Sequence, residues 1–147
     1  MTLRVRCLEP GDLTRWIALR ADLWPDQSLE ELDTEGRAAL AANPPLVVFV
    51  ADAGEDLLGF IEVGLRSVAE GCASSPTPYV EGWFVRLEAR RRGVGRALMR
   101  AVEDWCRARG YTELGSDARA DNRLSHVAHA ALGFDEVETL VVFRKAL

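Results

Sequence analysis

Six arginines crowd the fifteen residues RLEARRRGVGRALMR, from Arg86 to Arg100, in a chain that is otherwise acidic. The 147 residues carry a net charge of −5 at pH 7, and outside this stretch 22 acidic side chains face 12 basic ones. Three of the arginines, Arg90 to Arg92, directly precede the glycines Gly93 and Gly95. Arginine forms charge-assisted hydrogen bonds with phosphate oxygens, and glycine lets a ligand approach the backbone closely. The stretch therefore predicts a site for an anion such as a pyrophosphate.

The place of this stretch in the chain supports an anion site. It follows a predicted strand, Tyr79 to Val85, and opens a predicted helix, Gly93 to Arg109. The first N–H groups of a helix lack an intrahelical partner and the macrodipole makes them attractive to phosphate. The chain lacks the P-loop, which needs a lysine here, and the dinucleotide fingerprint, which needs a glycine where Leu98 stands. The alternative is a solvated helix face, which is our interpretation of three further arginines, Arg100, Arg107 and Arg109.

Two carboxylates are candidates for acid–base chemistry. Glu81 lies inside the predicted strand Tyr79 to Val85, where an unpaired carboxylate is costly. Asp117 follows the short predicted strand Thr112 to Ser116. If these strands are parallel neighbours, both carboxylates face one cleft. The alternatives are a structural salt bridge for Glu81 and a turn cap for Asp117.

A second acidic group follows Trp24, because residues 26–35 hold five Asp or Glu residues and no basic residue. Such a group attracts a polycation, and the Trp24 ring can stack on a sugar. The alternative is a solvated helix face. The other tryptophans considered, Trp16, Trp83 and Trp105, are typical of a core, and His126 and His129 belong either to a helix surface or to a site.

Hydrophobic periodicity predicts an α/β fold of the α+β kind, a mixed and mostly antiparallel sheet with a central parallel strand pair and flanking helices. A helix between two of the strands implies a right-handed crossover and hence the parallel pair. We expect a single domain over residues 1–147. The predicted strands are 3–8, 46–51, 57–65, 79–85, 112–116 and 137–143, and the predicted helices are 12–24, 28–42, 93–109 and 121–132, with Asp12, Ser28 and Asp121 as N-caps of three of them.

The composition excludes several classes of protein. No apolar run approaches the roughly 18 residues that span a membrane, and the first residues, MTLRVRCLEP, lack the apolar core of a signal peptide, so we expect a cytoplasmic protein. Cys7, Cys72 and Cys106 are odd in number and far apart, which predicts free thiols and no metal site. The acidity argues against a nucleic-acid binder and favours a cationic partner.

The motif R-x-x-G-x-G, from Arg90 to Gly95, resembles the acetyl-CoA pyrophosphate loop of the GCN5-related N-acetyltransferases, the GNAT superfamily. The segment DNRLSHVAHAALGF, residues 121–134, resembles the second coenzyme segment of that family. There Asn122 matches an asparagine that contacts the pantetheine arm, and Gly133-Phe134 matches a Gly-Phe pair at the helix end. His129 stands where the family has a tyrosine proposed to protonate the departing thiolate, which leaves the general acid open.

Five segments resemble the aminoglycoside 6′-N-acetyltransferases within this superfamily: LRADLWP, GCASSP, VEGWFV, SDARADN and HAALGFDEVE. That subgroup also has a histidine at the position of His129. The resemblance implies that Glu81 and Asp117 bind the acceptor and act in catalysis, and that Glu138 is offered across a dimer interface to the partner's site. Trp24 joins them as an acceptor contact. The predicted coenzyme contacts are Trp83, Phe84, Val85, Arg90, Arg91, Arg92, Gly93, Val94, Gly95, Arg96, Ala97, Asn122 and His129.

The predicted activity is direct acetyl transfer from acetyl-CoA to the 6′-amine of an aminoglycoside, which confers antibiotic resistance. A carboxylate, Glu81 or Asp117, takes the proton of the ammonium group through water. The N–H of Val85 stabilises charge on the thioester oxygen, and His129 or solvent protonates the thiolate. We expect a homodimer, with neither nucleic acid nor membrane as a partner. Alternatives are the same fold acting on a polyamine, another small amine or a protein amine, a non-catalytic coenzyme-binding module, and a nucleic-acid binder.

Overall fold

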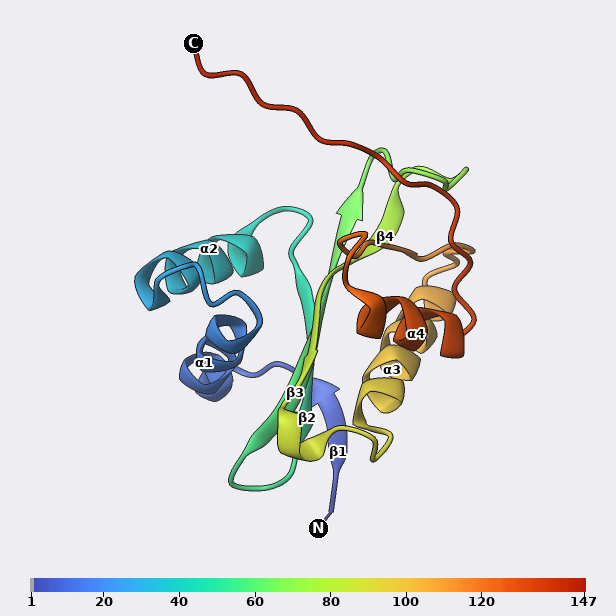
Figure 1. Ribbon diagram of the computed structural model, residues 1–147. Coiled ribbons are helices and arrows are strands. Elements are labelled where there is room, and N and C mark those ends of the chain that lie inside the picture. Colours follow the sequence, from blue (N-terminus) through green and yellow to red (C-terminus); the bar gives the residue numbers. More distant parts are fainter. Residues whose placement is uncertain (1) are drawn as a thin grey trace.

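The computed structural model describes residues 2–147, which contain five strands and four α-helices (Figure 1). The strands are β1 (Arg4–Cys7), β2 (Val47–Asp52), β3 (Leu57–Arg66), β4 (Thr77–Val85) and β5 (Gly115–Ser116). The helices are α1 (Leu13–Leu23), α2 (Leu29–Ala41), α3 (Val94–Ala108) and α4 (Arg123–Ala131), with short 3₁₀ turns at Pro10–Asp12 and Leu87–Ala89.

The sheet has the strand order β1-β2-β3-β4-β5. Its first three strand contacts are antiparallel, and β4 pairs with β5 in parallel. Helices α1 and α2 cover one face of the sheet, and α3 and α4 cover the other (Figure 1). The predicted mixed sheet with a parallel pair and flanking helices is therefore confirmed.

Apolar spacing explains how the helices pack. The apolar residues of α3 recur every three or four positions, and Leu98 and Val102 are fully buried against the sheet. On the opposite face, α1 and α2 bury Trp16 and Leu32 near Phe60 of β3. The sheet thus separates two cores, and a side chain of β4 faces one core or the other.

The helix starts agree with the sequence in one case and differ in another. The hydroxyl of Ser28 accepts the N–H of Glu31 over 3.1 Å, as the predicted cap requires. The prediction that Asp121 caps the last helix was wrong by one residue, because Oδ1 of Asn122 accepts the N–H of Ser125 over 3.1 Å. Asp121 is exposed and lies 3.3 Å from the guanidinium of Arg119 instead.

The last predicted strand was also wrong. Residues 137–143 form no strand within residues 2–147, and this segment runs away from the body of the molecule (Figure 1). Its apolar side chains are exposed, with Val142 at 82% and Phe143 at 88%. The apolar run 140–143 is typical of a strand, but in the structure it pairs with no strand among residues 2–147. The fifth strand is also shorter than predicted, since only Gly115 and Ser116 pair with β4.

Three predictions about protein class can be set against the structure. No helix within residues 2–147 combines the length and apolarity needed to cross a bilayer. Cys7, Cys72 and Cys106 are free, as predicted. Burial raises the pKa of the Cys106 thiol to about 11, which leaves it protonated and unreactive at neutral pH. Within the same residues no three His, Cys, Asp or Glu side chains are placed to hold a metal ion.

Candidate active site

The start of α3 presents unpaired backbone donors beside the arginine cluster. Gly93 is its N-cap and has a φ of 81°, a left-handed conformation that glycine adopts without strain. The first intrahelical bond joins the N–H of Ala97 to the carbonyl oxygen of Gly93 over 3.0 Å. The N–H groups of Val94, Gly95 and Arg96 therefore have no helical acceptor, and the macrodipole adds positive charge to them. These are the free donors that a pyrophosphate site requires.

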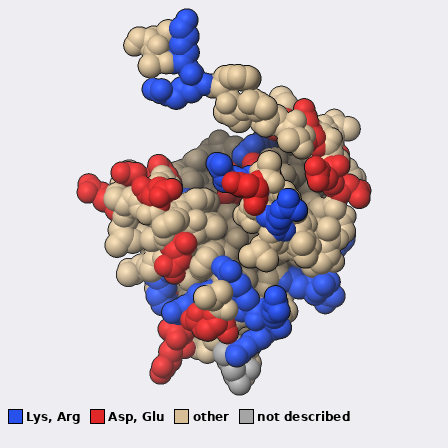
Figure 2. Space-filling view, viewed as in Figure 1, with Lys and Arg blue, Asp and Glu red and all other residues tan. Residues whose placement is uncertain are grey.

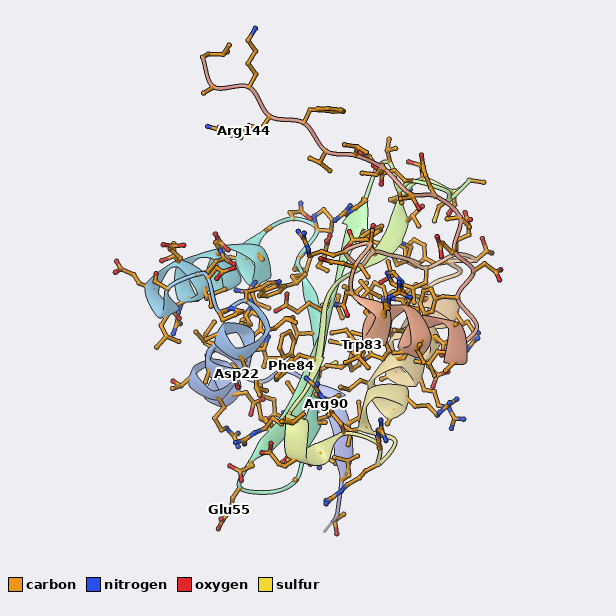
Figure 3. The ribbon with its side chains drawn as sticks, in the orientation of Figure 1. Asp22, Glu55, Trp83, Phe84, Arg90 and Arg144 are labelled. Carbon is orange, nitrogen blue, oxygen red and sulfur yellow. The ribbon has the colours of Figure 1, made fainter. Side chains whose placement is uncertain are left out.

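The arginines around this turn differ in what they contact. Arg90 donates from Nε to the carbonyl oxygen of Val85 over 2.8 Å, and its guanidinium lies 5.5 Å from the centroid of the Phe84 ring (Figure 3). It therefore packs back onto β4. By contrast Arg91, Arg92 and Arg96 are exposed and form no ion pair within residues 2–147. Basic side chains gather at this end of the molecule, in the lower part of Figure 2, where an anion can meet them.

The packing of the turn fits a phosphate-bearing coenzyme. A Cβ at Gly93 would meet no atom within 4 Å, so the turn is open on that side. A Cβ at Gly95 would lie 3.3 Å from the Trp83 ring, which shows how closely α3 approaches β4. Trp83 lies on the α3 side of the sheet and Phe84 on the opposite side (Figure 3). The indole Nε1 of Trp83 is buried without an acceptor among residues 2–147, and it adds an unpaired donor beside the turn.

The edge of β4 that faces β5 is open along its last residues. Only two residues of β4 pair with β5, so residues 81–85 have a strand neighbour on the β3 side alone within the described part of the chain. Next along the chain, Arg86 donates its N–H to the carbonyl oxygen of Leu58 over 2.8 Å. Because backbone groups alternate in direction along an antiparallel ladder, the N–H of Val85 points away from β3 and into this open edge.

A β-bulge aims Glu81 toward the α1–α2 side of the sheet. Val80 and Gly82 face consecutive residues of β3, so Glu81 between them has no partner on that strand. The extra residue turns Glu81 and Gly82 to the same face, where a Cβ at Gly82 would lie 2.8 Å from the Trp24 ring. The bulge thus brings Glu81 and Trp24, two predicted acceptor contacts, to one place.

A cleft of about 400 Å³ lies on this face of the sheet, and three glutamates line it together with Trp24. They are Glu35 of α2, Glu62 of β3 and Glu81 of β4. Arg20 of α1 also lines the cleft, and its Nε donates to Oε1 of the buried Glu62 over 2.7 Å. Burial raises the pKa of Glu62, and the guanidinium of Arg20 opposes that shift. This pair cancels its own charge, which leaves Glu35 and Glu81 as the other carboxylates of the cleft wall.

Glu81 is held by an ion pair, which bears out the salt bridge considered for it. Arg66 donates from Nη2 to one carboxylate oxygen over 2.6 Å and from Nε to the other over 3.1 Å. The same guanidinium lies 3.6 Å from the centroid of the Tyr79 ring, whose hydroxyl donates to Oδ2 of Asp117 over 2.9 Å. The carboxylates of Glu81 and Asp117 are therefore linked through Arg66 and Tyr79, although the residues lining the cleft include Glu81 and not Asp117.

His129 lies on the other face of the sheet, beside the open edge of β4. Its Nε2 is 2.7 Å from the hydroxyl oxygen of Ser116, and its Nδ1 is 2.7 Å from the carbonyl oxygen of Ser125. The rings of Trp83 and Phe134 pack edge-on against it, with centroids 5.4 and 5.1 Å away. The structure thus brings the predicted acid next to Trp83, at the strand that the coenzyme is predicted to follow.

Other predicted residues are placed differently. Val94 is buried in the core, so only its backbone can reach a ligand. Asn122 uses its side-chain oxygen to cap α4, and Nε2 of His126 lies 2.9 Å from the carbonyl oxygen of Arg119. Glu138 is exposed on the segment that leaves the body, so its own chain does not bring it to Glu81.

Sequence reasoning missed four residues that shape the cleft: Arg20, Glu62, Arg66 and Tyr79. Only Glu62 had a signal, since it interrupts the apolar run 57–65 and a buried carboxylate needs a partner. The contacts of Arg66 and Tyr79 follow from the strand register, which a single sequence does not reveal.

Comparison with known proteins agrees with this arrangement. The model of the acetyltransferase (GNAT) family matches residues 13–134. An aminoglycoside N(6′)-acetyltransferase type 1 from Klebsiella aerogenes is 41% identical over 146 residues, which cover 97% of this chain and 96% of that protein. Another from Stenotrophomonas maltophilia is 42% identical over 147 residues, which cover 97% and 93% of the two chains.

Solved structures give the same result. The structure of AAC(6′)-Iy in complex with the bisubstrate analogue CoA-S-monomethyl-acetylneamine matches with a TM-score of 0.92 at 34% identity, over 100% of both chains. A structure of the same aminoglycoside N-acetyltransferase in complex with CoA also has a TM-score of 0.92, covering 99% of this chain and 96% of the other. With a matching family model, full-length relatives and a shared fold, this chain belongs to the acetyltransferase (GNAT) family.

Proposed function

We propose that this chain transfers the acetyl group of acetyl-CoA to the 6′-amine of aminoglycosides and so confers resistance to them. One juxtaposition carries the proposal, because the open edge of β4 joins the donor-rich turn at Gly93 to the acidic cleft at Glu81. The identity of 41% and 42% to aminoglycoside N(6′)-acetyltransferases supports the choice of acceptor. In this proposal residues 1–147 act as a single N-acetyltransferase domain.

The coenzyme supplies an acetyl group activated as a thioester. The N–H groups of residues 94–96 and the exposed guanidiniums of Arg91, Arg92 and Arg96 bind its pyrophosphate. Gly93 leaves room for the phosphates, and Gly95 lets α3 approach β4. The remaining coenzyme contacts in this proposal come from Trp83, Phe84, Val85, Arg90, Ala97, Asn122 and His129.

The acidic cleft binds the acceptor. An aminoglycoside carries several ammonium groups, and Glu35 and Glu81 in the cleft wall attract them, with Asp117 close by. The Trp24 ring offers an apolar wall for a sugar. An ammonium group is not a nucleophile, so Glu81 or Asp117 takes its proton through a water molecule.

Two groups near the open edge of β4 act on acetyl-CoA. The N–H of Val85 donates to the thioester oxygen, where negative charge develops. In its doubly protonated form His129 gives the Nε2 proton to the departing thiolate and becomes neutral, and its contact with Ser116 holds the ring in place. The buried thiol of Cys106 stays protonated and takes no part.

We also propose a homodimer in which residues 137–143 of each copy dock on a second copy. The side chains of Val141, Val142 and Phe143 are 75–88% exposed, an apolar surface that water does not favour. Within residues 2–147, β5 has a strand neighbour on one edge only, and Leu124 and Val127 of α4 are also exposed. A second copy would cover these surfaces and bring Glu138 toward the partner's cleft.

Thiol release from acetyl-CoA with kanamycin, tobramycin and spermidine as separate acceptors tests the activity. We expect release with both aminoglycosides and a product acetylated on the 6′-nitrogen. At least one of Glu81→Gln and Asp117→Asn should lower kcat/KM by about 100-fold. Glu55→Gln, in the β2–β3 turn far from the cleft, is the matched control (Figure 3). Release with spermidine alone would move the acceptor to polyamines, and wild-type kcat/KM in both site variants would reject the assigned base.

A further inference from the structure

The carboxylate of Glu81 already has a cation beside it, the guanidinium of Arg66. We propose that Arg66 is a resident counter-ion that an acceptor ammonium group must displace from Glu81, which makes Arg66 a specificity-determining residue. This inference rests on the proposed function, since it concerns the residue that the acceptor meets in the cleft.

The geometry leaves an incoming donor little room at Glu81. Both carboxylate oxygens accept from Arg66, over 2.6 and 3.1 Å. From the strand side, Oε2 lies 3.2 Å from the position that a Cβ would take on Gly64, so the carboxylate rests directly on the backbone of β3. An ammonium group that forms strong hydrogen bonds with Glu81 therefore competes with Arg66 for the same oxygens.

Arg66 is placed so that it can leave. It is the last residue of β3, and its side chain is 36% exposed. The second arginine at this cleft differs: Arg20 is 7% exposed, pairs with Glu62 over 2.7 Å and also donates to the carbonyl oxygen of Leu32 over 2.7 Å. Solvent screens the Arg66–Glu81 pair, and partly exposed pairs contribute little net stability. Exchange of partners at Glu81 is therefore far less costly than at Glu62.

While it binds Glu81, the Arg66 guanidinium also contacts a second group. It stacks on the Tyr79 ring at 3.6 Å, and the hydroxyl of Tyr79 donates to Asp117, which is exposed. A guanidinium released from Glu81 can stay on this ring and turn toward Asp117. Its positive charge then remains balanced while the ammonium group occupies Glu81.

The exchange favours acceptors with several charges. When a monoamine displaces Arg66, it forms one ion pair with Glu81, and the two hydrogen bonds between Arg66 and Glu81 are lost. A polycation also meets Glu35 across the cleft, so its further ammonium groups offset the loss. Arg66 therefore selects polycations over single amines, and its removal should strengthen binding of both while narrowing the difference between them.

Calorimetric titration of the full chain, with CoA present, tests this by measuring the Kd of kanamycin and of 6-amino-6-deoxyglucose, a monoamine. We expect Arg66→Met to lower the Kd of kanamycin by about three- to tenfold at low salt, with a smaller change at high salt. The monoamine should gain by a larger factor. Arg66→Lys keeps the charge but not the two-bond pair, so its Kd values should lie between those of wild type and Arg66→Met. Arg107→Met, which removes an exposed arginine of α3, should change neither Kd.

An unchanged or higher Kd for kanamycin in Arg66→Met, with an unaltered thermal unfolding midpoint, would overturn the inference. If that variant is unstable, a crystal structure of the wild-type protein with kanamycin decides, because Arg66 still bound to Glu81 beside the ligand rejects displacement. Thiol release by the wild-type protein is measured separately. Its absence would reject the proposed function, whereas the Kd comparison would still test Arg66.

Discussion

The hydroxyl oxygen of Ser116 lies 2.7 Å from Nε2 of His129, while Nδ1 of the same ring lies 2.7 Å from the carbonyl oxygen of Ser125. A carbonyl oxygen only accepts hydrogen bonds, so Nδ1 carries the hydrogen of the neutral ring. Nε2 then accepts the hydrogen of Ser116, and it donates to Ser116 once the ring is doubly protonated. Ser116 thus connects the proposed acid to the parallel strand pair.

Removal of this hydroxyl tests whether the contact matters for proton transfer. If His129 delivers a proton through or beside Ser116, Ser116→Ala should lower kcat by about tenfold or more and leave the KM for acetyl-CoA nearly unchanged. Ser125→Ala is the matched control, because its hydroxyl lies 3.2 Å from Nδ1 while the backbone carbonyl that orients the ring remains. Steady-state kinetics would contradict this role if Ser116→Ala kept the wild-type kcat.

The exposed arginines at the start of α3 should contribute directly to coenzyme affinity. Arg96 lies in the first turn, beside the free N–H groups, whereas Arg100 lies one turn further along the helix. We expect Arg96→Ala to raise the Kd of acetyl-CoA by about fivefold or more, and less at high salt, because a charge-assisted bond to phosphate is lost. Arg100→Ala should have little effect. Equal effects of both substitutions in a binding titration would mean that only overall charge matters.

Local patterns in the sequence were enough for this part of the site. The start of α3 was predicted within one residue, since Gly93 marks the turn and Leu98 and Val102 repeat with the helical period. The donors that follow from a helix start need no long-range information. Sequence patterns therefore located the turn, whereas its open space and its contact with Trp83 could be seen only in the structure.

The acceptor side could be predicted only in part. Glu81 and Asp117 stood out as polar residues in or beside apolar strands, but the bulge that turns Glu81 toward Trp24 depends on how β4 pairs with β3. The same pairing brings Arg66, fifteen residues away, to Glu81. The strand predicted for residues 137–143 failed for another reason: its apolar residues are typical of a strand, yet the segment pairs with no strand among residues 2–147.

A buried carboxylate at the start of α1 predicts a pH-dependent stability. Arg6 donates to both oxygens of Asp12, over 2.7 and 3.0 Å, and Asp12 is almost fully buried. The hydrogen bonds from Arg6, more than any other contact, lower the pKa of Asp12 to about 2. The pKa of such a carboxylate is lower in the folded chain than in the unfolded chain. It therefore stabilises the fold at pH values above the unfolded-state pKa, and this stabilisation is lost as the pH falls toward the folded-state pKa.

Urea unfolding of wild type and Asp12→Asn measures that contribution. We expect the variant to be less stable by about 2 kcal/mol at pH 7, and the difference to shrink between pH 4 and pH 2 as wild-type Asp12 becomes protonated. Asp104→Asn, at an exposed carboxylate of α3, should match wild type throughout. A difference that stays constant down to pH 2 would show that the charge of Asp12 is not what stabilises the fold.

The exposed segment 137–143 leads to a prediction about assembly. If a second copy covers Val142 and Phe143, a carboxylate at either position would be buried without a partner, which an interface does not tolerate. Light scattering should therefore give a dimer for wild type and a monomer for Val142→Asp with Phe143→Asp. Leu147→Asp, also at an exposed apolar residue, should remain a dimer.

The loss of the dimer should also affect binding of the acceptor. Because Glu138 would no longer reach a partner's cleft in the monomer, the double variant should bind kanamycin more weakly, while its affinity for acetyl-CoA should match wild type. A wild-type monomer at micromolar concentration would remove the role proposed for Glu138.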